Sequence, residues 1–285
     1  MISRISFLGL YLIDIVLAYM LTKDYMAAAV TATIIPIILF FWQKITLFKS
    51  GATPINKCRR ADAALLKSAY CEVVKRAKTC GYRINKNVKL YISDEDTHNA
   101  YNCGRAIVIN RPVIYSAELR AILAHELNHH RCGHSYFSML LGANFFIFGI
   151  CISLFIGLYL LFIIIFFIAI LSIFTKNSGW LGMILAKLLI PLKRGVCNLI
   201  ITLLLAIEMA ISRSEEYASD AFATDTGYGE ELINFLSMDT SLRKPLTFTE
   251  RLLSSHPSDQ RRCAKIEQRL KNIYADDNNF PIFVE

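Results

Sequence analysis

The sequence has few charged residues and lacks several motifs that mark common functional classes. Only 19% of its 285 residues are charged, which is low for a soluble domain. It contains no Gly-rich phosphate loop, no nucleic-acid-binding motif, no low-complexity segment and no internal repeat. Its eight cysteines form no CxxC pair and no regular framework, a pattern typical of reduced thiols and not of disulfides. We therefore expect a cytosolic redox environment and no nucleic-acid partner.

Hydrophobic residues make up 54% of the chain and are concentrated in runs. A membrane-spanning helix needs about 20 apolar residues. The first run lacks a small-residue cleavage site and is followed at once by another, so we interpret it as a retained anchor and not as a signal peptide. The composition thus predicts an integral membrane protein, mainly α, with about four transmembrane helices. The runs are 5–22, 25–42, 136–174 and 196–211.

The net charge of +8 is unevenly distributed along the chain. Residues 43–137 carry 16 Lys and Arg against 7 Asp and Glu, whereas residues 212–285 carry 9 against 13. Basic residues just after a membrane helix mark the cytoplasmic side, and they also attract anionic lipid headgroups. We therefore expect a multi-pass protein of the cell (inner) membrane, with segment 43–137 in the cytoplasm.

The soluble segments show the periodicity of a small α+β domain. Residues 60–79 read as an amphipathic helix, and the β-rich stretches 88–92 and 105–114 as a small sheet. Ser116 is a candidate N-cap for the next helix. The last membrane helix is expected to continue past the bilayer and to stop near Gly227.

The helix expected after Ser116 carries the sequence HELNH, residues 125–129. Positions four apart lie on one face of a helix, so His125 and His129 can direct two imidazoles at one ion. Glu126 stands beside the first histidine, where it can hold a water molecule. The pattern predicts a zinc site, for which a third ligand is needed.

A third histidine close by in the sequence does not fit. The pattern H-E-x-x-H-x-x-G-x-x-H requires glycine at position 132 and histidine at position 135. This sequence has Cys132 and Ser135 there instead. His134 lies about nine residues past His125, near the opposite side of a continuous helix.

A glutamate on a second helix is the alternative source. In SRSEEYASDA, Glu216 and Asp220 are four residues apart and share a face. Glu216 can bind zinc while Asp220 accepts a hydrogen bond from the far nitrogen of a zinc histidine. Glu215 competes as a ligand, but its i+4 neighbour is Ser219, a poorer partner for that histidine.

The two ligand helices must end in one compartment, so an even number of membrane crossings separates them. As one helix, 136–174 would be about 57 Å long against a hydrocarbon core of about 30 Å. We prefer one crossing there, its near end continuing the HELNH helix, and a return through 180–211. The competing layout folds 136–174 into a tight hairpin.

Taken together, HELNH, the membrane hairpin and SRSEEYASDA resemble the HtpX-type membrane zinc endopeptidases, gluzincin relatives of the CAAX prenyl protease. NAYNCG (99–104) is similar to the segment before the family's active-site edge strand, and HPSDQRR (256–262) to its His-Pro motif. Glu215, where a basic residue is usual, and Ser219, where alanine is common, depart from the family.

The resemblance implies one Zn²⁺ per chain, held by His125, His129 and Glu216 with Asp220 behind them. It also implies Glu126 as the base and His256 as an oxyanion donor. Substrate is expected to bind at Asn99, Ala100 and Arg262, as an added strand.

The expected function is a zinc endopeptidase cutting membrane or membrane-associated proteins at the cytoplasmic surface, in protein quality control. A processing protease for a specific, for example lipidated, substrate is an alternative, as is a non-catalytic scaffold or signal transducer with a vestigial site. Expected partners are protein or peptide substrates and the bilayer; the oligomeric state is left open. The expected parts are a transmembrane hairpin (1–42), a first catalytic part (43–137), a second transmembrane hairpin (138–211) and a second catalytic part (212–285).

Overall fold

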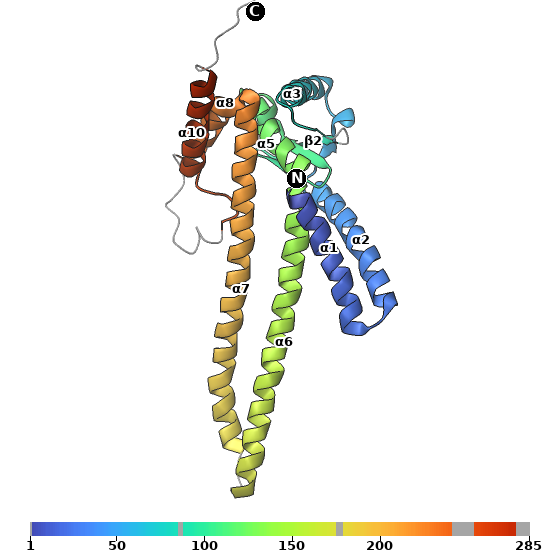
Figure 1. Cartoon of the computed structure of the whole chain (residues 1–285), viewed down its shortest axis with the longest axis vertical. Coiled ribbons are helices and arrows are strands. Elements are labelled where there is room, and N and C mark those ends of the chain that lie inside the picture. The colour runs from blue at the N-terminus through green and yellow to red at the C-terminus, as the bar shows by residue number, and fades with distance from the viewer. Residues whose placement is uncertain (1, 85–87, 175–178, 241–253, 278–285) are drawn as a thin grey trace, which may run out of the picture. The chain divides into compact units, whose positions relative to one another are not determined.

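A computed structural model of the chain describes residues 2–84, 88–174, 179–240 and 254–277 (Figure 1). It divides into two compact units, one formed by Met1–Leu140 with Ile211–Glu285 and the other by Leu141–Ala210. Among the described residues, four helices are long and apolar enough to cross a membrane, and each overlaps one of the four expected runs. The expected fold class is therefore confirmed: membrane helices joined to a small soluble α+β part.

The first two membrane helices form a hairpin within the first unit. Helix α1 (Ile2–Thr22) is followed by α2 (Tyr25–Lys49), and the two pack side by side (Figure 1). The Asp24 side chain accepts a hydrogen bond from the Met26 N–H at 2.9 Å and so caps α2. Helix α2 continues seven residues past the predicted end of the membrane run, which carries its basic end into the soluble part.

A four-stranded mixed sheet follows, in the order β1-β2-β4-β3. Its strands are β1 (Thr53–Pro54), β2 (Lys89–Ser93), β3 (Ala100–Cys103) and β4 (Ala106–Asn110). Strands β2 and β4 are parallel, and β3 pairs with β4 as an antiparallel hairpin. The predicted strand 105–114 is too long: residues Arg111–Ile114 form the short helix α4, because Pro112 lacks the N–H that a strand needs.

The two faces of the sheet contact different helices. Ile107 and Ile109 of β4 point into the main core, whereas Val108 points to the other face and packs with Leu47 from the end of α2. This alternation follows from the two-residue period of a strand. The sheet thus joins the membrane hairpin to the soluble core.

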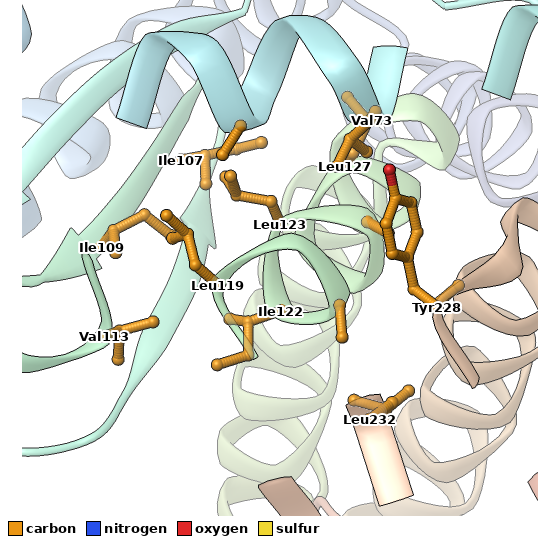
Figure 2. Packing of buried hydrophobic residues seen from close by; sticks show 14 of the residues in the cluster. Val73, Ile107, Ile109, Val113, Leu119, Ile122, Leu123, Leu127, Tyr228 and Leu232 are labelled. Carbon is orange, nitrogen blue, oxygen red and sulfur yellow. The ribbon is translucent and has the colours of Figure 1, made fainter. Parts of the chain in front are cut away.

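The main core forms between the sheet and the helices around it. Helix α3 (Arg60–Thr79), confirmed at the predicted bounds, contributes Val73, and α5 (Leu119–Cys132) contributes Leu123 and Leu127. Tyr228 and Leu232 close this core from the C-terminal half of the chain (Figure 2). All five side chains are at most 2% exposed, so α5 is held from several sides.

Helix α5 begins and ends differently from the prediction. It starts at Leu119 with Glu118 at the N-cap position, so the expected Ser116 cap is wrong; Ser116 instead belongs to the turn after α4. It ends at Gly133, whose φ of 76° is left-handed and whose N–H donates to the His129 carbonyl at 3.0 Å. The HELNH helix therefore does not continue into the next membrane helix.

The second unit consists of the C-terminal part of one long helix, α6 (His134–Phe174), and the N-terminal part of the next, α7 (Gly179–Ala223). Each is unbroken, so 136–174 forms one helix, as preferred, and not a tight hairpin. Long side chains of α7 reach across to glycines of α6. A Cβ at Gly142 would lie 3.0 Å from Glu208 Oε1, and one at Gly157 2.8 Å from Lys193 Nζ.

Beyond the membrane run, α7 returns to the first unit and ends as predicted. A π-helical turn, η2 (Thr224–Tyr228), contains Gly227 at φ 84°, where the helix is interrupted. Helices α8 (Gly229–Thr240) and α10 (Asp259–Asp277) then pack against each other. The HELNH helix and the SRSEEYASDA segment thus belong to the same unit.

Candidate metal centre

Helix α5 directs Leu123 and Leu127 into the core, so His125 and His129, each two residues further along, lie on the other side of the helix. His125 and Glu126 are both 7% exposed, and His129 is half-buried. The ring nitrogens Nε2 of His125 and His129 are 3.0 Å apart. The four-residue spacing therefore brings the two imidazoles together, as expected from the helix geometry.

Glu216 of α7 completes a group of three metal-ligand side chains. Its Oε1 lies 3.3 Å from His129 Nε2 and its Oε2 3.6 Å from His125 Nε2. One ligand atom from each residue lies within 4.8 Å of the others. Zn–N and Zn–O bonds of 2.0–2.2 Å in a tetrahedron separate neighbouring ligand atoms by about 3.3 Å. The donor set and its spacing therefore fit zinc.

Asp220 lies one turn further along α7, behind the first histidine. Its Oδ1 is 3.0 Å from His125 Nδ1, the nitrogen that faces away from the other two ligands. A carboxylate at this nitrogen fixes the tautomer that leaves Nε2 free to bind a metal. The structure thus places Asp220 where the sequence reasoning expected it.

Arg262 of α10 makes contacts that differ from the expected substrate contact. Its guanidinium donates to both oxygens of Asp220, Nε to Oδ2 at 2.8 Å and Nη2 to Oδ1 at 2.6 Å, and Nη1 lies 3.3 Å from Glu216 Oε2. The side chain is buried. Burial opposes the charge, but the Asp220 carboxylate outweighs it and raises the pKa of Arg262. Arg262 therefore braces two acidic residues of the centre.

Glu126 is enclosed by the same group of charges. Burial raises the pKa of its carboxyl to about 7, although the nearby His125 acts in the opposite direction. A carboxyl with a pKa near neutrality can both accept and release a proton under cellular conditions. The position and the pKa therefore suit an acid–base role.

His256, from the turn before α10, lies on the open side of the centre. Its Nδ1 is 3.1 Å from Glu216 Oε2, and 63% of its side chain is exposed. The hydrogen bond to Glu216 raises the pKa of His256. The structure thus brings this histidine to the ligand glutamate from a segment 40 residues away.

Asn99 and Ala100 lie at the start of β3. The Asn99 carbonyl accepts from the Asn110 N–H at 3.1 Å, and its side chain accepts from the Ala100 N–H. Among the strands that the structure describes, β3 is paired on one side only, by β4, and it packs on α5. It therefore offers an open strand edge next to the HELNH helix.

Two further contacts were missed by the sequence reasoning. Asn128, inside HELNH, donates to the buried Ser219 at 3.1 Å and so ties α5 to α7. Ser219, one of the two departures from the family pattern, thus has a structural partner. His134 contacts His129, while Glu215, the rival ligand, lies outside the group of three and 3.9 Å from His134.

These features define the class, a membrane-bound metallopeptidase with a candidate metal site of two histidines and one glutamate. The chain belongs to peptidase family M48, whose sequence pattern matches residues 66–270. The matched span begins in α3 and includes HELNH, Glu216 and Arg262. The resemblance seen in the sequence is thereby confirmed at the level of the family.

Comparisons with curated proteins and with solved structures give weaker similarities than the family match. No curated protein matches the chain. Six chains of solved structures do, including the crystal structure of S. mikatae Ste24p, with a TM-score of 0.46 and 20% sequence identity. That match covers 91% of this chain and 62% of Ste24p, so this chain spans less than two thirds of the other.

Proposed function

We propose that this protein is a zinc-dependent endopeptidase that cleaves membrane or membrane-associated proteins at the cytoplasmic membrane surface. The observation that carries the proposal is the joint presence of three metal ligands and a buried acid–base residue, Glu126, beside them. A purely structural zinc site has no need of that glutamate. The membership of family M48 supports peptide-bond hydrolysis.

His125, His129 and Glu216 would hold the zinc, which when bound polarises the scissile carbonyl and lowers the pKa of a water molecule. Glu126 takes the proton from the attacking water and later gives it to the leaving amine. His256, whose pKa is raised by its hydrogen bond to Glu216, can donate to the developing oxyanion. The base thus lies on α5, whereas the donor comes from the turn before α10.

Substrate would bind as an extra strand along the open edge of β3. Such binding depends on backbone hydrogen bonds and gives broad selectivity, which suits the removal of misfolded proteins. Both ligand helices lie close in sequence to membrane helices: α6 begins five residues after His129, and Glu216 is on α7 itself. A site so placed can reach the parts of membrane proteins that lie near the bilayer surface.

The orientation follows from the charges. Lys44 and Lys49 end α2, and Lys57, Arg59 and Arg60 follow it within the same unit as the centre. Excess positive charge beside a membrane helix favours the cytoplasmic side. We therefore infer a cytoplasmic catalytic part in a protein of the cell (inner) membrane.

The test compares wild type with Glu126→Gln in detergent or proteoliposomes, on a misfolded membrane protein and on short lipidated peptides. Glu126→Gln is expected to keep one zinc per chain and to lose about 10²–10⁴-fold in cleavage rate. Glu267→Gln, a change at an exposed glutamate of α10, is the control. Full activity in Glu126→Gln would refute the proposal. Exclusive cleavage of the lipidated peptides would favour a processing protease.

A further inference from the structure

The far nitrogen of His129 has a histidine as its partner. His129 Nδ1 lies 2.8 Å from Nδ1 of His134, and the two rings meet edge to face with centroids 4.9 Å apart. His134 is 6% exposed, and its Nε2 is 3.9 Å from Glu215 Oε1. His134 thus contacts the side of the His129 ring that faces away from Glu216, and Glu215 lies near the other nitrogen of His134.

This contact exists because the HELNH helix is broken. On a continuous helix, His134 would be turned about 140° around the axis from His129 and would face away from it. The left-handed Gly133 ends α5, and α6 starts afresh at His134. The break thus returns the His134 ring to the metal side, which corrects the expectation that His134 lies on the opposite side of the helix.

Ligation fixes the direction of the hydrogen bond. His129 can bind a metal through Nε2 only when that nitrogen is unprotonated, so its proton resides on Nδ1. Nδ1–H then donates to His134 Nδ1, which must itself be unprotonated. His134 in turn carries its proton on Nε2, on the side of Glu215. Only this arrangement of protons satisfies both histidines.

We propose that His134 is the positioning residue of His129, in the same way that Asp220 and Arg262 serve His125. This inference rests on the proposed zinc function and adds a second support to the centre.

The first test is zinc affinity of the detergent-purified full chain, measured by competition with a chelator. His134→Phe keeps a planar ring but removes the acceptor and is expected to weaken zinc binding by about 10- to 100-fold. His134→Asn, whose amide oxygen can stand in for Nδ1, should recover most of that loss. His130→Phe is the matched control, because His130 is equally buried but directs its Nδ1 to the Gly104 carbonyl.

Wild-type affinity in His134→Phe would overturn the inference, as would an equal loss in His130→Phe. If wild type binds zinc and His134→Phe binds it equally well, this inference alone is refuted. If wild type binds no zinc, the proposed function is refuted as well. Nitrogen NMR of ¹⁵N-histidine-labelled, zinc-loaded wild type is independent of any variant. It should show His134 protonated on Nε2 and not on Nδ1, and the reverse would refute the arrangement.

Discussion

Replacing Glu126 by glutamine should stabilise the metal-free protein at alkaline pH. Folding raises the pKa of this carboxyl from 4.5 to about 7, because the side chain is buried. The protonated form is therefore favoured in the folded state. Below pH 4.5 the carboxyl is protonated in both the folded and the unfolded state, so it does not lower the free energy of unfolding. Above about pH 7 the folded protein carries the full cost of a buried charge.

The magnitude follows from the size of the shift. A difference of about 2.5 pKa units corresponds to about 3 kcal/mol, at 1.36 kcal/mol per unit. Glutamine is close to the protonated carboxyl in shape and does not titrate. The free energy of unfolding of Glu126→Gln should thus match wild type near pH 4 and exceed it by about 3 kcal/mol near pH 8.

The assay is denaturant unfolding in detergent with a chelator present, at a series of pH values. Glu267→Gln, exposed on α10, should show no comparable pH-dependent gain. Added zinc should shrink the gap, because a nearby divalent cation lowers the pKa of a carboxyl. A gap that stays constant with pH, or a less stable Glu126→Gln at pH 8, would refute the reasoning.

Three further changes test the supports of the centre. Arg262→Ala leaves the buried Asp220 carboxylate without its partner and should cost about 3–5 kcal/mol of unfolding free energy, measured by the same denaturant titration; no change would show that the pair does not brace the fold. Ser219→Ala removes one hydrogen bond, to Asn128, and should cost only about 1 kcal/mol while the cleavage rate stays near wild type. Gly133→Ala forces a left-handed alanine and should lower stability by about 1–2 kcal/mol, together with zinc affinity as measured by chelator competition.

Local periodicity made much of the centre predictable. The four-residue spacings of His125 with His129, and of Glu216 with Asp220, follow from helix geometry, and the structure brings these side chains together. The helix at 60–79 and the stop near Gly227 also follow from local signals. Such features depend on residues that are close in sequence.

The remaining features depend on single backbone positions or on distant partners. The position of His134 changes with the left-handed turn at Gly133, which a periodic pattern does not reveal. The contact between Arg262 and Asp220 joins residues 42 positions apart and follows from no local pattern. The apolar pattern of 105–114 suggests one long strand, but β4 ends at Asn110, two residues before Pro112.

The central claim is that α5 and α7 share one zinc ion, and the most direct measurement is metal content of the purified protein. Wild type should contain one zinc per chain, and both His129→Ala and Glu216→Ala should lose it. Because these residues are 87 positions apart in the sequence, loss in both variants would join the two helices in one site. Zinc retained at full content in Glu216→Ala would contradict the account.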